Sequence, residues 1–194
     1  EWLRPHFASI TMEVQALERA DYERLIRRGL NSVLLYQETY NAATYKSYHP
    51  KGKKSNMDYR LQAPDRLGQA GIHRIGIAAL LGLEDWRVDS AFVALHLGYL
   101  ERCYWRTKYS ISLPRLRPAA GCQPPNVVVS NRDFVQLICA YRIYNENAEI
   151  SLSTRESPAL RDHLLKLGIT SMSAGSKTEP GGYSIDSEAL EQFQ

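Results

Sequence analysis

The sequence predicts an α/β fold, and more narrowly a partial TIM-type (β/α) barrel with about six of its eight βα units. Short apolar segments alternate with amphipathic helical segments, at about 25 to 40 residues for each unit. No GxGxxG or P-loop motif follows a predicted strand, which argues against a nucleotide-binding doubly wound sheet. Polar clusters follow most of the strands instead of two at a switch point, and this distribution is typical of a barrel.

Most predicted elements have a local signal at one end. Gly29 ends the first helix, Asp85 and Ser130 can cap later helices, and Pro158 suits a first helical turn. Segment 41–58 is polar and is predicted as one long loop. The predicted strands are 8–15, 32–37, 73–79, 109–114, 148–153 and 169–174, and the predicted helices are 17–28, 59–70, 86–106, 131–144 and 158 to about 167.

We treat residues 1–194 as one domain of a barrel that lacks two strands, which we expect on the N-terminal side. The last segment, 175–194, is rich in Gly, Ser and Glu and ends without a closing element. Unpaired strand edges would make such a truncated barrel prone to aggregation.

Composition excludes several classes of protein. Net charge is only +3, from 24 basic and 21 acidic residues, and this is too small to indicate a nucleic-acid partner. The one dense basic run, Lys51 to Lys54, is more typical of a solvated loop than of a phosphate site. Three cysteines stand without metal-ligand or disulfide spacing. There is no signal peptide and no apolar run of about 20 residues, so we expect a cytoplasmic protein without a membrane contact.

Polar residues after the second strand form the first candidate binding cluster. Tyr36, Gln37, Glu38 and Thr39 follow a short apolar run that is expected to be buried on both faces. A carboxylate beside an amide and a hydroxyl suits the hydroxyls of a ribose or an ammonium group. The alternative is a capped turn whose glutamate forms a salt bridge.

Arginines supply a second set of candidates. Arg115 and Arg117 flank one leucine, so in an extended segment both face one way and could bind a carboxylate. Pairing of both with acidic residues of the chain is the alternative. Arg60, early in a predicted helix, could also bind a carboxylate or could be solvated.

The remaining candidates follow later strands. Ser153, Thr154, Arg155 and Glu156 form the third cluster, in which Arg155 and Glu156 could simply pair with each other. Small residues from Ser173 onward would let a ligand approach the backbone. Because no zinc spacing and no GxSxG elbow occurs, we expect a cofactor to supply the chemistry.

Several segments together resemble the 2-iminoacetate synthase (ThiH) family, the radical SAM tyrosine lyases of thiamine biosynthesis, over nearly the whole chain. The Gln-Glu-Thr-Tyr and Arg-Leu-Arg-Pro signatures are shared with the related HydG family, whereas residues 85–89 and 177–183 favour the ThiH family. The later half resembles the BATS region, which is associated with biotin and thiamine synthesis. The segments are Tyr36–Tyr40, His49–Lys53, Pro64–Arg66, Ala70–Ile72, Trp86–Ser90, Pro114–Pro118, Leu152–Ser157 and Ser173–Ser176.

The resemblance implies S-adenosylmethionine (SAM) and a 4Fe-4S cluster as cofactors. It implies cleavage of the Cα–Cβ bond of L-tyrosine to 2-iminoacetate and p-cresol, with a ThiG-like thiazole synthase and a flavodoxin-type electron donor as partners. The family holds its cluster with a CxxxCxxC loop, which does not occur in this sequence. We therefore expect the chain to begin downstream of that loop and to be inactive alone.

The resemblance also implies roles for the candidate residues. Tyr36, Gln37, Glu38, Thr39, Arg60, Ala78 and Leu80 would bind SAM, the last two from the backbone that flanks the adenine. Arg115, Arg117, Ser153, Thr154, Arg155 and Glu156 would bind and position tyrosine. Two other functions remain open: a HydG-type tyrosine lyase of hydrogenase maturation, and a non-catalytic barrel fragment that binds a partner.

Overall fold

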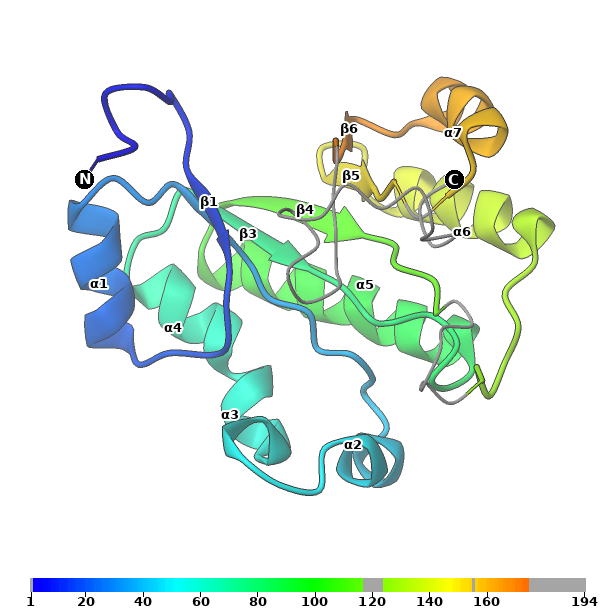
Figure 1. Cartoon of the computed structure of the whole chain (residues 1–194), viewed down its shortest axis with the longest axis horizontal. Helices are drawn as coiled ribbons and strands as arrows, with labels where there is room; N and C mark the ends of the chain where they lie inside the picture. The colour runs from blue at the N-terminus through cyan, green and yellow to red at the C-terminus, as the bar shows by residue number, and fades with distance from the viewer. Residues whose placement is uncertain (1, 117–123, 155, 175–194) are drawn as a thin grey trace, which may run out of the picture.

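The computed structural model describes residues 2–116, 124–154 and 156–174. Six parallel strands lie side by side in chain order and form a curled half-barrel with helices on its outer face (Figure 1). This arrangement confirms the predicted partial (β/α) barrel. The strands are β1 (Thr11–Glu13), β2 (Ser32–Leu34), β3 (Arg74–Ile77), β4 (Lys108–Ser112), β5 (Glu149–Leu152) and β6 (Ser171–Met172).

Helices connect the strands. The α-helices are α1 (Arg19–Arg27), α2 (Ala42–Tyr48), α3 (Met57–Leu61), α4 (Ala63–Gln69), α5 (Trp86–Cys103), α6 (Asn131–Tyr144) and α7 (Pro158–Leu164), and two short 3-10 helices are η1 (Lys53–Ser55) and η2 (Leu165–Leu167). Within the described residues, no helix is long and apolar enough to cross a membrane.

The two faces of the sheet differ because side chains alternate along each strand. The register places Val33, Ile75, Tyr109, Ile111 and Ile150 on one face, where all five are buried. There they pack under the helices, in one core that includes Leu67, Leu97, Phe134 and Ile138. Burial of these apolar side chains is the main force that holds the helices on the sheet.

The concave face carries small and polar side chains. The same register aligns Leu34, Gly76 and Ser110 across β2 to β4, and Ser112 with Ser151 across β4 and β5. A Cβ on Gly76 would lie 2.3 Å from a Leu34 methyl carbon and 2.9 Å from the Ser110 hydroxyl. Glycine is therefore required here for Leu34 and Ser110 to approach each other, and small residues leave open space inside the half-barrel.

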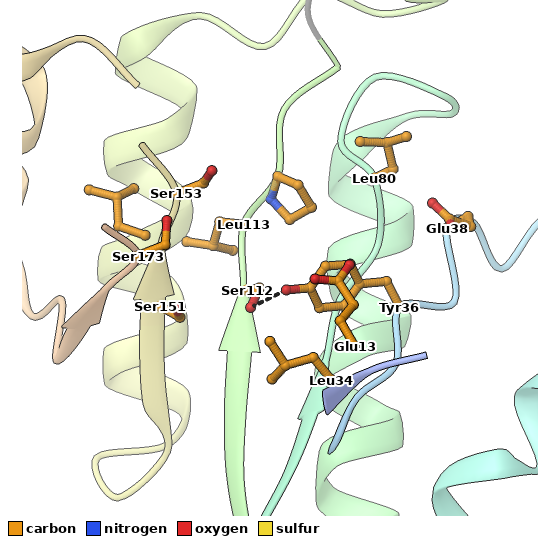
Figure 2. A pocket seen from close by; sticks show the side chains of 12 residues that line it. Glu13, Leu34, Tyr36, Glu38, Leu80, Ser112, Leu113, Ser151, Ser153 and Ser173 are labelled. Carbon is orange, nitrogen blue, oxygen red and sulfur yellow. Dashed lines mark hydrogen bonds between the residues drawn. The ribbon is translucent and has the colours of Figure 1, made fainter. Parts of the chain in front are cut away.

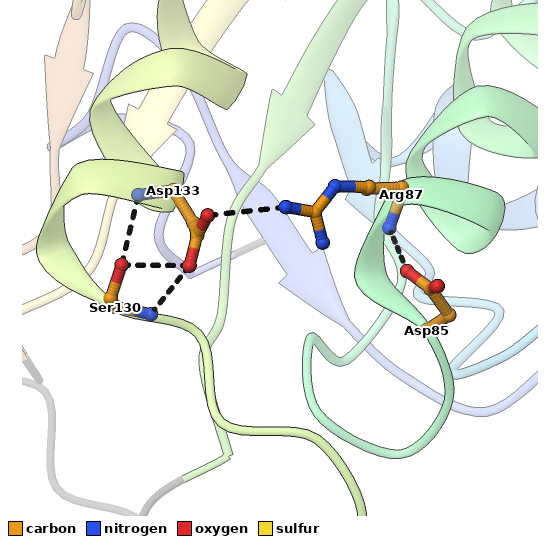
Figure 3. A network of polar contacts seen from close by, with 4 residues as sticks. All are labelled: Asp85, Arg87, Ser130 and Asp133. Atoms are coloured by element: carbon orange, nitrogen blue, oxygen red, sulfur yellow. Dashed lines mark hydrogen bonds and ion pairs between the residues drawn. The ribbon is translucent and has the colours of Figure 1, made fainter.

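Capping explains why α5 and α6 begin where the sequence predicts. The Asp85 side chain accepts a hydrogen bond from the Arg87 amide at 2.9 Å. Ser130 and Asp133 form a reciprocal capping box at the start of α6, which spans the predicted residues (Figure 3). Arg87 also lies 3.4 Å from Asp133, so an ion pair links the beginnings of the two helices.

Two predictions between β2 and β3 are wrong. Segment 41–58 is not one loop, because the Asn41 side chain accepts hydrogen bonds from the Ala43 and Thr44 amides and begins α2. The predicted helix 59–70 is two helices, α3 and α4, separated at Gln62. Pro64 in the first turn of α4 accounts for the break, since proline cannot continue the hydrogen-bond ladder of a preceding helix.

Candidate functional site

A cavity of about 390 Å³ lies at the carboxyl ends of the strands, on the concave face of the half-barrel (Figure 2). Every strand or the residues directly after it contribute to its lining. The lining residues are Glu13, Leu34, Tyr36, Glu38, Leu80, Ser112, Leu113, Pro114, Ser151, Leu152, Ser153 and Ser173. In parallel α/β sheets this edge is where ligands bind, and the cavity is therefore the candidate active site.

The residues after β2 alternate between the cavity and the helix layer. Tyr36 and Glu38 line the cavity, and the Tyr36 hydroxyl lies 3.1 Å from the Ser112 hydroxyl on β4. Gln37 and Thr39 are 4% and 0% exposed and are not among the lining residues. The Gln37 Nε2 atom is buried and has no hydrogen-bond partner among the described residues. Only half of the predicted cluster therefore lies at the cavity.

Thr39 has a structural contact instead. Its hydroxyl donates a hydrogen bond to Asp89 Oδ1 on α5 at 3.1 Å, and the Tyr40 amide donates to the same oxygen at 2.8 Å. Asp89 is 1% exposed, and burial raises the pKa of its carboxyl group. This pair of bonds ties the segment after β2 to α5.

Glu38 is held in a strained conformation at the cavity wall. Its φ is +75°, in the left-handed region that is rare for residues other than glycine. Its carbonyl accepts a hydrogen bond from the Leu80 amide at 2.7 Å, and the Gln37 amide donates to the Ala78 carbonyl at 2.8 Å. The backbone of Ala78 and Leu80 is predicted to flank a ligand, but the Ala78 carbonyl and the Leu80 amide are hydrogen-bonded to Gln37 and Glu38. The Leu80 side chain lines the cavity.

Two cations lie beside the Glu38 carboxylate. Lys54 Nζ is 2.6 Å from Glu38 Oε1, and Arg60 Nη2 is 3.7 Å from the same oxygen. Arg60 is 8% exposed and donates from Nε to the Tyr36 carbonyl at 2.8 Å. A small hollow lined in part by Gln15, Lys54 and Arg60 adjoins the group. With one carboxylate and two cations, the cluster carries a net positive charge and suits a ligand that has both an ammonium and a carboxylate.

Lys54 is the functional candidate that sequence reasoning missed. The sequence predicts a solvated loop for the basic run 51–54, and Lys54 is partly exposed, with 41% of its side chain accessible. Its backbone is fixed by the Tyr45 hydroxyl, which donates to the Lys54 carbonyl at 2.6 Å. The contact between Lys54 and Glu38 depends on the position of the whole segment after α2, which the sequence alone does not give.

Arg115 is paired inside the protein. It is 4% exposed, and its Nε donates to Glu156 Oε1 at 2.8 Å while Nη2 binds Glu156 Oε2. Nη1 donates to the Val129 carbonyl at 2.9 Å and to Asn131 Oδ1 at 3.0 Å. Most of its donors are thus already bonded, and this agrees with the alternative of pairing with an acidic residue. Arg117 and Arg155 lie outside the described residues.

The other late candidates are near the cavity. Ser153 lines it, and the Thr154 amide donates to the Ser173 hydroxyl at 3.2 Å, which joins the ends of β5 and β6. The Thr154 hydroxyl is buried and has no hydrogen-bond partner in the described part of the chain. Glu13 also lines the cavity and is exposed, because β1 is an edge strand that pairs only with β2 among the described strands.

A metal centre is not evident in the part of the chain that the structure describes. No group of three or more His, Cys, Asp or Glu side chains lies close enough together there to hold an ion. Cys103 and Cys139 have free thiols.

Comparison with known proteins identifies relatives over nearly the whole chain. The biotin and thiamin synthesis associated domain matches residues 112–192. The 2-iminoacetate synthase of Escherichia coli K12 is 52% identical over 192 residues, which are 98% of this chain and 51% of that protein. The 2-iminoacetate synthase of Salmonella typhimurium LT2 is 50% identical over the same extent. The chain therefore spans about half the length of these relatives.

Solved structures share the fold. The FeFe-hydrogenase maturase HydG from Carboxydothermus hydrogenoformans superposes with a TM-score of 0.84 and 36% identity, over 91% of this chain and 42% of that chain. Another HydG structure gives a TM-score of 0.81 and 35% identity, over 87% and 38% of the two chains. Methylornithine synthase (PylB) is similar in fold alone, with a TM-score of 0.71 at 18% identity over 95% of this chain and 54% of that one.

Proposed function

The chain belongs to the 2-iminoacetate synthase family, and on that premise we propose that the full-length protein is a radical SAM lyase that cleaves the Cα–Cβ bond of L-tyrosine. The products would be 2-iminoacetate and p-cresol, and 2-iminoacetate would supply the thiazole moiety of thiamine. The observation that carries the proposal is about 50% identity over 98% of the chain, together with a polar cavity at the expected edge of the sheet.

SAM fits the cluster around Glu38. The Glu38 carboxylate can accept the ammonium of the methionyl group, and Lys54 and Arg60 can bind its carboxylate. Tyr36 and Leu80 offer an aromatic and an apolar surface at the cavity wall for the rest of the cofactor. When bound, the cofactor supplies the radical chemistry that breakage of an unactivated bond requires. Burial of Arg60 and the bond from its Nε to the Tyr36 carbonyl hold this wall in position.

The 4Fe-4S cluster does not fit the described residues, because no suitable ligand group occurs there. We therefore propose that its ligands lie in the half of the full-length protein that this chain does not span. The electron donor, which we propose to be of the flavodoxin type, would act at that cluster. For the same reason we propose that this chain alone is inactive.

Tyrosine would occupy the side of the cavity formed by β4 to β6. The hydroxyl-bearing residues Ser112, Ser151, Ser153 and Ser173 line that side and can bind the amino and carboxyl groups of the substrate. Leu34 and Leu113 supply apolar surface for the phenol ring. Because Arg115 is bound to Glu156, we assign the arginine clamp to Arg117 and give Arg115 and Glu156 a positioning role.

A second candidate, the HydG-type reaction, is favoured by the 35–36% identity to HydG structures. Product analysis separates the two functions. The full-length protein, reconstituted with iron and sulfide under reducing conditions, is incubated with SAM and tyrosine. We expect p-cresol and 2-iminoacetate, whereas release of carbon monoxide and cyanide would indicate the HydG type.

Absence of any tyrosine-derived product from a reconstituted, SAM-binding protein would contradict both lyase functions. It would leave the barrel as a module that binds a partner. As part of the lyase function we propose a ThiG-like thiazole synthase as the partner and a cytoplasmic location. Both proposals would lose their support if no product formed.

A further inference from the structure

Helix α5 carries an apolar stripe on its exposed side. Val88, Phe92, Leu95 and Tyr99, here called the α5 stripe, are 49%, 46%, 64% and 42% exposed. Their spacing of four, three and four residues is the heptad spacing of a helix that packs along a second helix. Ala91 is the other exposed residue between Arg87 and Arg102, so this side of the helix carries no exposed charge over three turns.

Exposed helices of a soluble protein usually present charged residues to water. Helix α1 of this chain does so, since Arg19, Arg24 and Arg27 are exposed. A continuous apolar stripe of large side chains is instead typical of a surface that another protein covers.

The position of α5 limits what can cover it. The helix connects β3 to β4 at the centre of the sheet and packs across it (Figure 1). The sheet has unpaired edges only at β1 and β6 among the described strands, and strands that complete the barrel would join there. Strands that pair with β1 and β6 would extend the sheet at its edges and would not by themselves cover the α5 stripe.

We propose that the α5 stripe is the centre of a symmetric contact between two copies of this protein, with the two α5 helices antiparallel. The two-fold axis would pass between Val93 and Ala94. Val88 of each copy would then lie opposite Tyr99 of the other copy, and Phe92 opposite Leu95. Such a contact is self-complementary, as a two-fold interface requires.

Charges at the two ends of α5 favour this direction. In the antiparallel pair, Arg102 of one copy lies opposite Asp85 of the other, and Arg87 lies near Glu101. A parallel pair would place Arg87 beside Arg87 and Arg102 beside Arg102 of the other copy. Since like charges oppose association, the antiparallel arrangement is the one that the sequence of α5 supports.

A hollow beside the stripe would enlarge the contact. It lies between α5 and α6, has a volume of about 290 Å³, and is bordered by the small side chains of Ala91, Ala94 and Ala140. An apolar cavity of about 150 Å³ accepts a benzene ring, so this hollow can receive an aromatic side chain of the second copy. A standard interface buries roughly 800 Å² per partner, and for a contact centred on one helix per copy we expect a weaker association, with dissociation in the micromolar range.

Sedimentation velocity of the full-length protein between about 1 and 200 µM tests the proposal, because this range brackets a micromolar dissociation constant. The wild type should change from monomer to dimer with concentration. Leu95→Glu and Val88→Lys should remain monomeric, since each places a charge in the contact. Ile143→Glu is the matched control, because Ile143 on α6 is 87% exposed and does not line the hollow.

Circular dichroism and tyrosine cleavage establish that each variant is folded, and the contact does not depend on the proposed activity. Two outcomes would overturn the proposal. One is a wild-type protein that stays monomeric over the whole concentration range. This outcome includes the case in which the α5 stripe binds a different protein. The other is a dimer that Leu95→Glu and Val88→Lys leave intact.

Discussion

Removal of the Glu156 carboxylate should destabilise the protein strongly, because it leaves the Arg115 guanidinium buried without its counter-ion. Both side chains are nearly inaccessible, at 4% for Arg115 and 2% for Glu156. The substitution that isolates this effect is Glu156→Leu, which replaces the carboxylate by an apolar group. Breaking one partner of a buried ion pair typically costs about 3–5 kcal/mol.

The structure places the expected cost at the lower end of that range, at about 3 kcal/mol. Two hydrogen bonds to Glu156 are lost, but Nη1 of Arg115 keeps its bonds to the Val129 carbonyl and to Asn131. The guanidinium also keeps its position over the Phe134 ring, 4.5 Å from the centroid. These contacts compensate part of the lost charge pairing.

A double-mutant cycle in urea measures the coupling between the two residues. Arg115→Met with Glu156→Leu removes both charges together, so it should cost at least about 2 kcal/mol less than the sum of the single substitutions. The Michaelis constant for tyrosine is measured on the same variants wherever they fold. The reasoning is refuted if Glu156→Leu costs less than about 1 kcal/mol while Arg115→Met abolishes tyrosine binding without loss of stability.

Three further predictions concern the neighbours of the cavity. Lys54→Met should weaken SAM binding several-fold in equilibrium dialysis and change the free energy of unfolding by less than about 1 kcal/mol, because the ion pair is partly exposed; unchanged affinity would exclude Lys54 from the site. Asp89→Ala should lower the free energy of unfolding by about 2 kcal/mol, since two hydrogen bonds are lost. Asp89→Asn should be near neutral at pH 7, because its amide oxygen can accept both bonds and burial raises the pKa of the Asp89 carboxyl. Equal losses for the two variants in urea titrations would contradict this prediction. Burial lowers the pKa of His96, so its contribution to stability should be present above pH about 6.5 and lost as the pH falls through the folded-state pKa. Thermal unfolding at a series of pH values should show a flatter dependence of the melting temperature on pH in this range for His96→Gln. An unchanged slope would contradict this prediction.

Local signals were sufficient to predict the fold and several helix boundaries. Helix α6 spans the predicted residues because Ser130 and Asp133 cap it within one turn. Helix α2, which the sequence does not predict, has a local cap at Asn41. Its buried residue is Tyr45, which is 1% exposed, and this burial depends on tertiary contacts of the folded chain. A short polar helix of this kind depends on its surroundings and is difficult to predict from its own sequence.

The candidate site was predicted less completely, for two different reasons. The directions of Tyr36 to Thr39 continue the side-chain alternation of β2, but they lie beyond its end at Leu34, and the positive φ of Glu38 is not evident from the sequence. The contacts of Glu38 with Lys54, and of Arg115 with Glu156, join residues far apart in the chain. Such pairs are determined by tertiary structure, and periodicity does not reveal them.

Binding of SAM at the cavity wall beside Glu38 is tested by a comparison of two adjacent residues that face opposite ways. SAM affinity is measured by isothermal titration calorimetry on the full-length reconstituted protein and on two variants, Glu38→Gln and Thr39→Ser. Glu38→Gln should lose at least about tenfold in affinity, because a charge-assisted bond to the ammonium is worth about 1.5–3 kcal/mol. Thr39→Ser should bind as the wild type does, since its hydroxyl still reaches Asp89. Wild-type affinity in Glu38→Gln would contradict the assignment of this cavity.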